Sequence, residues 1–460
     1  MQNIKIKDII NLTKGVLVQG NLELECIEFS KDTRTIKGGE IYIGIKGEKF
    51  DGNKFWKEAL NQGADAVIVQ DISFKEEELK EFENKTIIKV ENTLEALYKI
   101  AKFKRELYNI PVIAITGSVG KTSTKDIVAN VVSKKYKTLK TEGNNNNNIG
   151  MPLTILKLKD HEAMVLEMGM NHLKEMEELS MIACPDISAI TNVGTAHIGE
   201  LGNRENILKA KMEIITGMSD DSMLVINNDN DMLSTVEVER LNLIRVGIDN
   251  GVDFKARNVV LSDEGSTFDF EYKGKVYSVD VPVPGKHFVM NALIAIAIGL
   301  QLDISPEQCI KGVKEFELTR NRMDIVELKN NITLIDGTYN ASEDSMKSSI
   351  DVLATYKRRK IAVLADMLEL GEYSEQLHRN IGMYVAKNKI DILVAVGQES
   401  KYIIDAASKA GVKQICYCNS NEEVVNYLEK IIQSNDVILF KGSNGMKLGN
   451  VVALMKEKLM

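Results

Sequence analysis

The segment that most constrains the fold of this chain is a glycine turn, Thr116-Gly-Ser-Val-Gly-Lys-Thr122, set between an apolar run and a helix-compatible stretch. Residues 111–115 are typical of a buried parallel strand, and residues 125–134 are compatible with a helix. In that setting Gly117 and Gly120 let the backbone curl so that its N–H groups point inward at an anion. The pattern therefore predicts an α/β protein with a phosphate-binding loop.

The turn also carries the side chains that a bound nucleotide needs. Lys121 places a positive charge near the terminal phosphates, and Thr122 places a hydroxyl where Mg²⁺ can bind. The glycine spacing is shorter than in the common form of this loop and occurs more often by chance, so a plain glycine turn with a lysine that reaches solvent is the alternative. The flanking strand and helix favour nucleotide binding by this loop, and the family resemblance described below implies that the nucleotide is ATP, bound by Gly117, Ser118, Val119, Gly120, Lys121, Thr122 and Ser123.

Composition excludes several classes of function. A length of 460 residues predicts two to three domains, and a net charge of −8 argues against a nucleic-acid partner. The first residues lack the apolar run of a secretory signal, and no stretch is apolar enough for a membrane span. The five cysteines are scattered and are expected to be reduced thiols. These features predict a cytoplasmic protein.

Changes in pattern divide the chain into three predicted domains. An amino-terminal region over 1–108 mixes short strands with helices, and Pro111 marks its end because proline disfavours a helical residue before it. A central region over 109–321 repeats apolar strands that each end in a polar residue, with helices between them. A third region over 322–460 repeats the alternation and predicts a doubly wound, Rossmann-like domain. The chain is therefore expected to be α/β, with a mostly parallel central sheet.

The expected elements follow apolar runs and periodic patterns. Alternation of apolar and polar residues over 266–272 indicates a more antiparallel insertion, which covers roughly 253–283. Helices are predicted at residues 93–107, 125–134, 205–216 and 292–300. Strands are predicted at residues 40–45, 64–69, 163–167, 188–192, 223–227, 332–336, 361–366, 392–396 and 437–440.

Polar residues follow several predicted strands, at the sheet edge where ligands of parallel sheets gather. Glu167 closes a strand downstream of the phosphate loop, where an acidic residue commonly holds Mg²⁺, although a solvated strand end is the alternative. His197 follows another strand beside a glycine turn, and the roles of metal ligand and structural hydrogen-bonding residue are equally open. Asp336, Tyr339 and Asn340 follow a strand of the last region.

Other polar residues are ambiguous from their patterns alone. Lys211 lies on a predicted helix, where lysines are usually solvated. Asn146 and Asn147 precede a turn, and their amides could bind a ligand or fill the turn locally. Asn291 precedes an apolar helix that it could simply cap.

These segments together resemble the Mur ligases, the ATP-dependent amide-bond ligases of peptidoglycan precursor synthesis. The similarity spans the chain, keeps the order of the family's motifs and includes the short glycine spacing. Residues 366–372 and Lys441-Gly-Ser443 are similar to segments of the family branch that adds D-alanyl-D-alanine rather than a single amino acid. The resemblance rests on Ser30-Lys-Asp-Thr-Arg34, residues 46–55, the phosphate loop, residues 143–154, Glu167-Met-Gly169, residues 191–200, residues 210–214, residues 366–372 and Lys441-Gly-Ser443.

The resemblance implies a catalytic group made of Lys121, Glu167, His197 and Lys211. Lys211 matches a lysine that CO₂ carbamylates, which turns a cation into an anionic metal ligand. Thr122 and Glu167 would then hold one Mg²⁺, and His197 and carbamylated Lys211 a second. Further ATP-binding positions are implied at His287, Asn291, Arg322 and Asp336.

The resemblance also implies two substrates, UDP-N-acetylmuramoyl-tripeptide (UDP-MurNAc-tripeptide) and D-Ala-D-Ala, and a monomer. The amino-terminal domain would bind the UDP-sugar, the central P-loop-type ATPase domain would bind ATP, and the carboxyl-terminal domain would bind the dipeptide. The implied substrate-binding residues are Ser30, Asp32, Arg34, Gly47, Asp51, Asn146, Asn147, Tyr339, Asn340, Lys441 and Ser443.

The last domain departs from the family pattern at several positions. The family commonly shows Asp-Asp-x-Tyr-Asn-Ala-Asn-Pro, whereas this chain has Asp336-Gly-Thr-Tyr-Asn-Ala-Ser-Glu343. Asn321 stands where a glycine usually precedes Arg322, and Asn444 replaces an arginine. Asp336, Tyr339 and Asn340 are retained, which predicts a working site.

The implied reaction converts a substrate carboxylate into an acyl phosphate with ATP, and the dipeptide amine then attacks it. One rival is a ligase that adds a single amino acid, or glutamate to a folate; the UDP-sugar segments and residues 366–371 disfavour it. The other rival is a nucleotide-binding regulator without catalysis, prompted by Gly337 and Asn444. Retention of Glu167, His197 and Lys211 disfavours that second rival, because a sensor needs no second metal.

Overall fold

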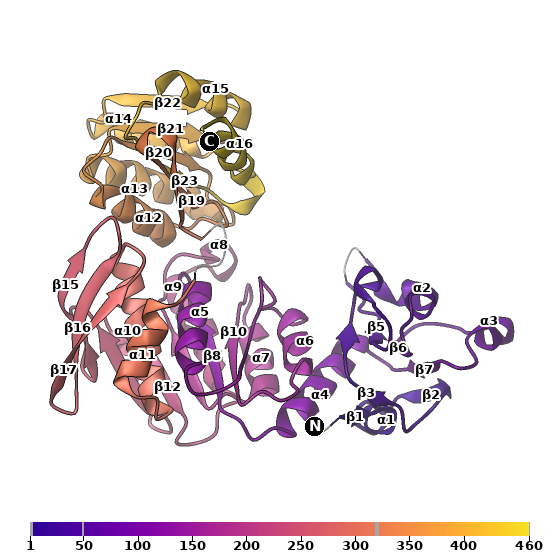
Figure 1. The fold of residues 1–460 in the computed structure, drawn as a ribbon. Coiled ribbons are helices and arrows are strands. Elements are labelled where there is room, and N and C mark those ends of the chain that lie inside the picture. Colours follow the sequence, from indigo (N-terminus) through magenta and orange to yellow (C-terminus); the bar gives the residue numbers. More distant parts are fainter. Residues whose placement is uncertain (1–2, 48–49, 318–321, 460) are drawn as a thin grey trace.

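The computed structural model describes residues 3–47, 50–317 and 322–459. The described residues form three α/β bodies that follow one another along the chain (Figure 1). The central body lies beneath the carboxyl-terminal body, and the amino-terminal body lies to one side of it. The α/β class is confirmed. Within the described ranges, no helix combines the length and the apolar character that crossing a bilayer requires.

The central sheet is parallel at every pairing, in the order β14-β13-β12-β11-β8-β10-β9. Its inner strands are buried along their whole length, which explains their unbroken apolar runs: helices cover such a sheet on both faces. The strands are β8 (Val112–Thr116), β9 (Thr138–Lys140), β10 (Ala163–Glu167), β11 (Ile187–Ile190), β12 (Met223–Asn227), β13 (Asn242–Gly247) and β14 (Phe254–Lys255). The helices are α5 (Lys121–Val132), α6 (Gly150–Leu156), α7 (Glu175–Ala183), α8 (Ile198–Leu201), α9 (Arg204–Met212), α10 (Lys286–Gln301) and α11 (Pro306–Lys314).

The predicted antiparallel insertion is a three-stranded meander beside this sheet (Figure 1). It comprises β15 (Arg257–Leu261), β16 (Ser266–Tyr272) and β17 (Lys275–Val281). Its inner face packs against α10 and α11, so the alternation of apolar and polar residues reflects one buried and one solvated face.

The amino-terminal sheet has the order β2-β7-β6-β5-β4 and is antiparallel only where β2 joins β7. Helix α4 packs against α1 of its own body and also against α6 and α7 of the central body. Because α4 contacts both bodies, the domain boundary at residue 108 stays a prediction. The strands are β1 (Ile4–Lys5), β2 (Val16–Gln19), β3 (Glu25–Cys26), β4 (Phe29–Ser30), β5 (Ile41–Ile43), β6 (Ala66–Val69) and β7 (Thr86–Lys89). The helices are α1 (Ile6–Thr13), α2 (Trp56–Asn61), α3 (Glu76–Glu81) and α4 (Thr93–Glu106).

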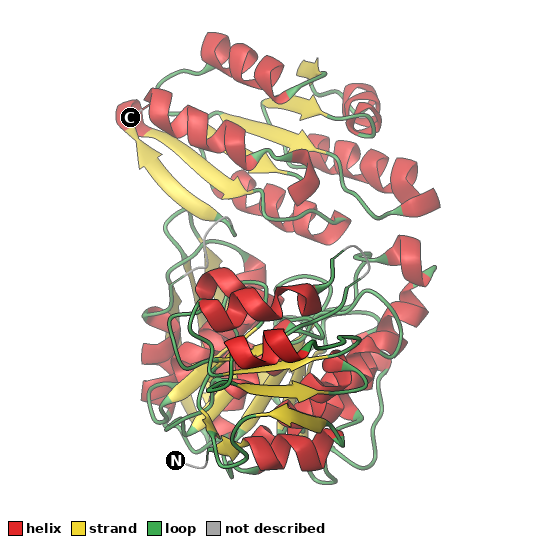
Figure 2. Ribbon diagram, turned by 90° about the vertical axis from the view of Figure 1, so that its right-hand side faces the viewer, coloured by secondary structure: helices red, strands yellow, loops and turns green. Residues whose placement is uncertain are grey.

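The carboxyl-terminal sheet has the order β18-β19-β23-β20-β21-β22 and is parallel except at β18. Helices lie on both sides of it (Figure 2). The strands are β18 (Asp324–Leu328), β19 (Ile332–Gly337), β20 (Lys360–Ala365), β21 (Ile392–Val396), β22 (Gln414–Cys418) and β23 (Val437–Lys441). The helices are α12 (Glu343–Thr355), α13 (Ser374–Lys387), α14 (Ser400–Lys409), α15 (Asn421–Ile431) and α16 (Gly449–Leu459).

Each predicted strand lies within two residues of its expected bounds, but three other predictions need correction. Helix α5 begins at Lys121 rather than at residue 125, because the glycine turn leads directly into it. Helix α10 begins at Lys286, so Asn291 lies inside the helix and does not cap it. The edge strands β18 and β22 escaped prediction because neither is an unbroken apolar run. The boundary proposed after residue 321 falls outside the described residues.

Candidate active site

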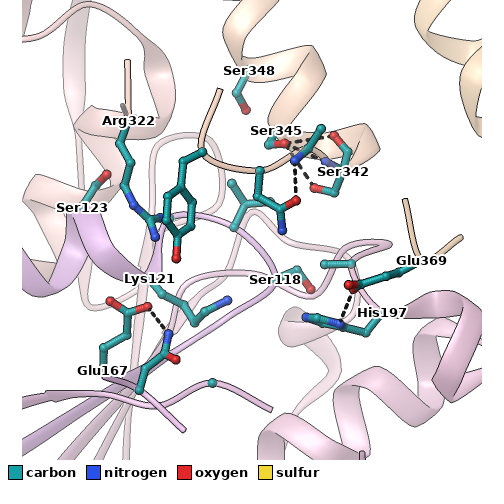
Figure 3. Close-up of a pocket in the computed structure, with 18 of the residues that line it drawn as sticks. Ser118, Lys121, Ser123, Glu167, His197, Arg322, Ser342, Ser345, Ser348 and Glu369 are labelled. Carbon is teal, nitrogen blue, oxygen red and sulfur yellow. Dashed lines mark hydrogen bonds and ion pairs between the residues drawn. The ribbon is translucent and has the colours of Figure 1, made fainter. Parts of the chain in front are cut away.

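The carboxyl edges of two sheets meet at one cleft of about 390 Å³, between the central and carboxyl-terminal bodies (Figure 3). Residues that follow β8, β10 and β11 line one wall, and residues that follow β19, β20 and β23 line the other. This is the position where parallel α/β sheets bind ligands. The predicted site residues that line it are Ser118, Val119, Gly120, Lys121, Ser123, Asn146, Asn147, Glu167, His197, His287, Arg322, Tyr339, Asn340 and Lys441.

The phosphate loop between β8 and α5 requires its glycines. Gly117 has φ +152° and Gly120 has φ +84°, both in the region that side chains rarely adopt. A Cβ atom on Gly117 would also lie 1.9 Å from Thr191 Oγ1. The loop closes on itself, because Lys121 Nζ donates a hydrogen bond to the Gly117 carbonyl at 2.7 Å. The lysine is thus held over the loop, where a phosphate would lie.

Two of the loop amides are engaged within the protein. The Ser118 N–H donates to the Asn192 carbonyl at 3.0 Å, and the Val119 N–H donates to Asn192 Oδ1 at 2.8 Å. The first turn of α5 has no intrahelical acceptors for its N–H groups, as in any helix. The amides that can meet a phosphate are therefore those at the start of α5 rather than those of Ser118 and Val119.

Glu167 at the end of β10 joins three of the predicted residues. Its side chain is 1% exposed, and its Oε2 accepts a hydrogen bond from Thr122 Oγ1 at 2.7 Å. Its other oxygen, Oε1, accepts one from Asn146 Nδ2 at 2.7 Å. The carboxylate and the hydroxyl are hard oxygen donors of the kind that Mg²⁺ prefers. The arrangement fits a divalent cation that also contacts phosphates.

Lys211 and His197 form a second group, and both side chains favour their neutral forms. Lys211 is 2% exposed, and burial, reinforced by the charge of Lys121, lowers the pKa of its ammonium well below its ordinary value. Burial, followed by the charges of Lys121 and Lys211, lowers the pKa of His197 to about 4. Lys211 does not line the cleft, yet its charge acts on His197.

The opposite wall is built around cationic side chains. The guanidinium carbon of Arg322 lies 3.8 Å from the centroid of the Tyr339 ring. Lys441 Nζ donates hydrogen bonds to the carbonyls of Gly337 at 3.0 Å and Asn340 at 2.5 Å. Burial, reinforced by Arg322, lowers the pKa of Lys441 to about 7, and burial together with Lys441 lowers the pKa of His287 to about 4. Arg322 is therefore the permanent positive charge of this wall, and an anionic ligand beside it would also favour the protonated form of Lys441.

Three further predicted residues support the cleft without lining it. Asp336 Oδ1 accepts hydrogen bonds from Thr338 N at 3.0 Å and Thr338 Oγ1 at 2.7 Å, so the carboxylate fixes the turn after β19. Ser443 Oγ accepts a hydrogen bond from the Leu368 N–H at 2.9 Å. Asn291 lies buried in α10 beside Gly120, and its Nδ2 has no hydrogen-bond partner among the described residues. The ligand-binding roles of Asp336 and Ser443 stay predictions.

The five predicted residues of the amino-terminal body do not line this cleft, and they make local contacts instead. Arg34 forms two hydrogen bonds with Asp32, at 2.8 and 2.6 Å, and Ser30 donates to the Asp32 carbonyl at 3.0 Å. Asp51 accepts from the N–H of Asn53 at 3.0 Å, and Gly47 donates to the Phe50 carbonyl at 2.8 Å. Residues 48 and 49 of the predicted UDP-sugar segment lie outside the described residues.

Sequence reasoning missed a row of serines on the cleft side of α12. Ser342 is the N-cap residue of the helix, and Ser345, Ser348 and Ser349 follow at helical spacing. A spacing of three to four residues places side chains on one face, and that signal was present in the sequence. Glu369 also lines the cleft, and its carboxylate faces His197 (Figure 3).

The donor set around the cleft differs from that of a preformed metal site. Among the described residues, no group of three or more His, Cys, Asp or Glu side chains lies close enough to hold a metal ion. A cation at Glu167 would therefore need further oxygen ligands from a substrate, as Mg²⁺ in phosphate-transfer sites does.

Comparisons with known proteins agree with this architecture. Three family models match successive parts of the chain: the Mur ligase family catalytic domain over residues 29–105, the Mur ligase middle domain over 115–299, and the Mur ligase glutamate ligase domain over 321–444. The UDP-N-acetylmuramoyl-tripeptide--D-alanyl-D-alanine ligase of Bacillus subtilis is 36% identical over 97% of both chains.

Solved structures give the same result. MurF from Acinetobacter baumannii superimposes with a TM-score of 0.91 at 28% identity, over 99% of both chains. MurF ligase from Thermotoga maritima, in complex with ADP, superimposes with a TM-score of 0.83 at 27% identity, over 94% of this chain and 97% of that one. The chain therefore belongs to the Mur ligase family.

Proposed function

We propose that this protein is an ATP-dependent ligase that joins D-Ala-D-Ala to UDP-MurNAc-tripeptide and so forms UDP-MurNAc-pentapeptide in peptidoglycan precursor synthesis. The observation that carries the proposal is the single cleft in which the phosphate loop faces the cationic wall of Arg322 and Lys441. Full-length similarity to ligases that bear this name supports the choice of substrates. We expect the reaction to take place in the cytoplasm, on a monomer.

The chemistry is amide formation from a carboxylate, which is a poor electrophile until ATP converts it into an acyl phosphate. Lys121 and the first-turn amides of α5 hold the β- and γ-phosphates. Arg322, stacked on Tyr339, faces the same phosphates from the other wall. Negative charge grows as the phosphoryl group is transferred and again when the dipeptide amine attacks, so positioned cations stabilise both steps. The two walls also exclude water that would hydrolyse the acyl phosphate.

Two groups of side chains are suited to Mg²⁺, which supplies positive charge that neutralises the phosphates and the substrate carboxylate. Glu167 and Thr122 are the first group, because their oxygens already lie 2.7 Å apart. His197 and Lys211 are the second group, and Lys211 joins it as a carbamate. Asn146, hydrogen-bonded to Glu167, keeps that carboxylate in place.

Carbamylation of Lys211 follows from its environment. Only a neutral amine can attack the carbon of CO₂; a C–N bond forms and a proton is released, which leaves an anion on the side chain. Burial favours the neutral form of the Lys211 amine, because it lowers the pKa well below its ordinary value. Helix α9 places this side chain within electrostatic reach of His197, so the new anion would lie near the imidazole.

The proposal is tested by turnover with defined substrates. The purified protein is incubated with Mg-ATP, bicarbonate and UDP-MurNAc-tripeptide, with and without D-Ala-D-Ala, and the product is identified by mass. Acceptors with diaminopimelate and with lysine as third residue are compared. Pentapeptide formation and phosphate release that both depend on the dipeptide support the proposal. Addition of a single amino acid contradicts the choice of substrate, and ATP binding without any product indicates a non-catalytic regulator.

A further inference from the structure

The loop after β20 reaches from the carboxyl-terminal body to the start of α8 in the central body. Glu369 lies on this loop, and its Oε2 is 3.3 Å from His197 Nδ1 (Figure 3). The imidazole is 21% exposed and the carboxylate is 62% exposed. A residue of one body therefore contacts the histidine that the other body contributes to the cleft.

The backbone on both sides of Glu369 is anchored. The Met367 N–H donates to His378 Nε2 at 3.0 Å, and the Leu368 N–H donates to Ser443 Oγ at 2.9 Å. On the other side Leu370 is 3% exposed, and the Tyr373 hydroxyl donates to the Gly202 carbonyl of the central body at 2.6 Å. The backbone on either side of Glu369 is therefore anchored independently of the contact between Glu369 and His197.

The backbone of this loop also lies close to the backbone of α8. A Cβ atom on Gly199 would lie 2.6 Å from the Glu369 carbonyl oxygen, so only glycine permits this approach. Glu369 itself has φ +65°, a conformation that costs a non-glycine residue about 1 kcal/mol. A strained residue held by its surroundings, with its side chain directed at a site histidine, is a pattern found at functional sites.

The contact favours one tautomer of the imidazole. The negative charge of the Glu369 carboxylate, 3.3 Å from Nδ1, favours hydrogen on Nδ1, and in the neutral ring Nε2 then keeps the lone pair. Carboxylates that fix metal-bound histidines in this way typically contribute tenfold to hundredfold in metal affinity. We propose that Glu369 is a positioning residue that holds His197 with Nε2 available to the second divalent cation. This inference rests on the proposed role of His197.

The geometry has a consequence for the cleft as a whole. Because Glu369 comes from the carboxyl-terminal body, His197 is oriented only while that body is docked on α8. Metal affinity at the second position and docking of the carboxyl-terminal body are then linked, since each favours the other.

The test measures cation binding directly. Mn²⁺ is titrated by electron paramagnetic resonance into the full-length protein with a non-hydrolysable ATP analogue, UDP-MurNAc-tripeptide and bicarbonate. Glu369→Ala is expected to weaken the second Mn²⁺ about tenfold and leave the first unchanged. Glu369→Gln retains an oxygen that can accept from Nδ1, so it should lose about threefold or less. Glu372→Ala is the matched control, because Glu372 is an exposed glutamate of the same loop for which the described structure records no ion pair.

The variants separate failure of this inference from failure of the proposed function. Unchanged Mn²⁺ binding in Glu369→Ala, with weakened second-site binding in His197→Ala, overturns the positioning role and leaves the metal assignment intact. Unchanged binding in His197→Ala overturns the metal assignment itself. Small-angle scattering and the affinity for the ATP analogue are measured on the same samples. If Glu369→Ala alters either of them as strongly as it alters the second Mn²⁺, the residue is structural and the inference is wrong.

Discussion

The two walls of the cleft hold their polar side chains in different ways. On the central wall the side chains bond to one another: Glu167 accepts from both Thr122 and Asn146. On the carboxyl-terminal wall Lys441 bonds to the backbone of the turn after β19, since its Nζ donates to the carbonyls of Gly337 and Asn340. The central wall thus holds a carboxylate that two neighbouring side chains fix in place. The other wall holds a lysine that is fixed by backbone carbonyls.

Few polar contacts join the walls. The Thr195 N–H donates to Asp344 Oδ2 at 3.0 Å, Tyr373 donates to the Gly202 carbonyl, and Glu369 faces His197. In the proposed mechanism phosphates bind on one wall and the cations of the other wall face them, so catalysis would require both walls to be docked. The residues that are proposed to act on ATP and substrate therefore differ from most of the residues that hold the two walls together. Single substitutions can distinguish these two roles.

Loss of Lys211 should have the largest effect, because it removes the proposed ligand of the second cation from the central body. We expect Lys211→Ala to reduce kcat on the order of 10³-fold, comparable to loss of a strong electrostatic group in other enzymes. Bicarbonate should stimulate wild-type protein prepared in CO₂-free buffer and should not restore the variant. Lys209→Ala, an exposed lysine of the same helix, is the control. Near-normal turnover by Lys211→Ala would exclude this residue from the metal site.

Gly194→Ala should separate the walls while leaving the metal ligands in place. A Cβ atom on Gly194 would lie 1.9 Å from Asp344 Oδ2, so this carboxylate, which accepts from the Thr195 N–H across the two walls, must move. If the carboxyl-terminal wall moves with this carboxylate, a misplacement of about 1 Å between the reacting groups costs about tenfold to a hundredfold in kcat. The double variant with Asp344→Ala removes the obstructing carboxylate and should recover most of the loss. If the double variant is as slow as Gly194→Ala alone, the obstruction lies elsewhere.

The walls also differed in how far the sequence predicted them. Lys121, Glu167 and His197 each follow a predicted strand of one parallel sheet, and the structure brings them to one edge. An apolar run that ends in a polar residue can be recognised in the sequence, and a parallel sheet brings the ends of such runs to one edge. The grouping of these three residues on the central wall could therefore be predicted. The helix start at Lys121 was placed four residues late because no capping residue precedes it; Gly120 takes that position.

The other wall could not be read in this way. Asp336 is predicted to bind the nucleotide, and the structure adds a contact that the motif did not indicate: its carboxylate accepts a hydrogen bond from Thr338. The direction in which a side chain turns depends on its neighbours in space, which motif order does not supply. The pair Glu369 and His197 lies 172 residues apart in sequence and meets only when two bodies dock. The helical spacing of the α12 serines is visible in the sequence and places them on one face. That this face lines the cleft could be known only from the structure.

Lys441 should make stability depend on pH. Burial lowers its pKa from 10.5 to about 7 in the folded state, so between those pH values the unfolded chain binds one more proton than the folded chain. The free energy of unfolding therefore rises with pH across this window, by about 1.4 kcal/mol per pH unit from this group, and the full penalty is present below pH 7.

Removing the amine should flatten that dependence. We expect the difference in Tm between wild type and Lys441→Met, measured by calorimetry, to change steadily between pH 7 and pH 10 as the wild type gains stability. Lys447→Met, an exposed lysine close by, should keep the wild-type slope. Parallel curves for wild type and Lys441→Met would mean that the amine stays protonated in the folded protein.

Gly337→Ala should have the smallest effect and tests a departure from the family pattern, because an aspartate is common at this position. A Cβ atom would lie 3.0 Å from Lys441 Cδ and 3.4 Å from the Phe440 carbonyl oxygen, so the lysine stem must give way. Its bonds to Gly337 and Asn340 would then loosen, and we expect the KM for D-Ala-D-Ala to rise about threefold to tenfold, roughly 1 kcal/mol. The KM for ATP should stay within about twofold, since the phosphate loop is on the other wall. In a Lys441→Ala background the same substitution should add nothing, because the coupling runs through that side chain. An equal effect in both backgrounds would show that Gly337 acts on the turn itself. Dipeptide binding would then depend on the backbone conformation of this turn rather than on the position of Lys441.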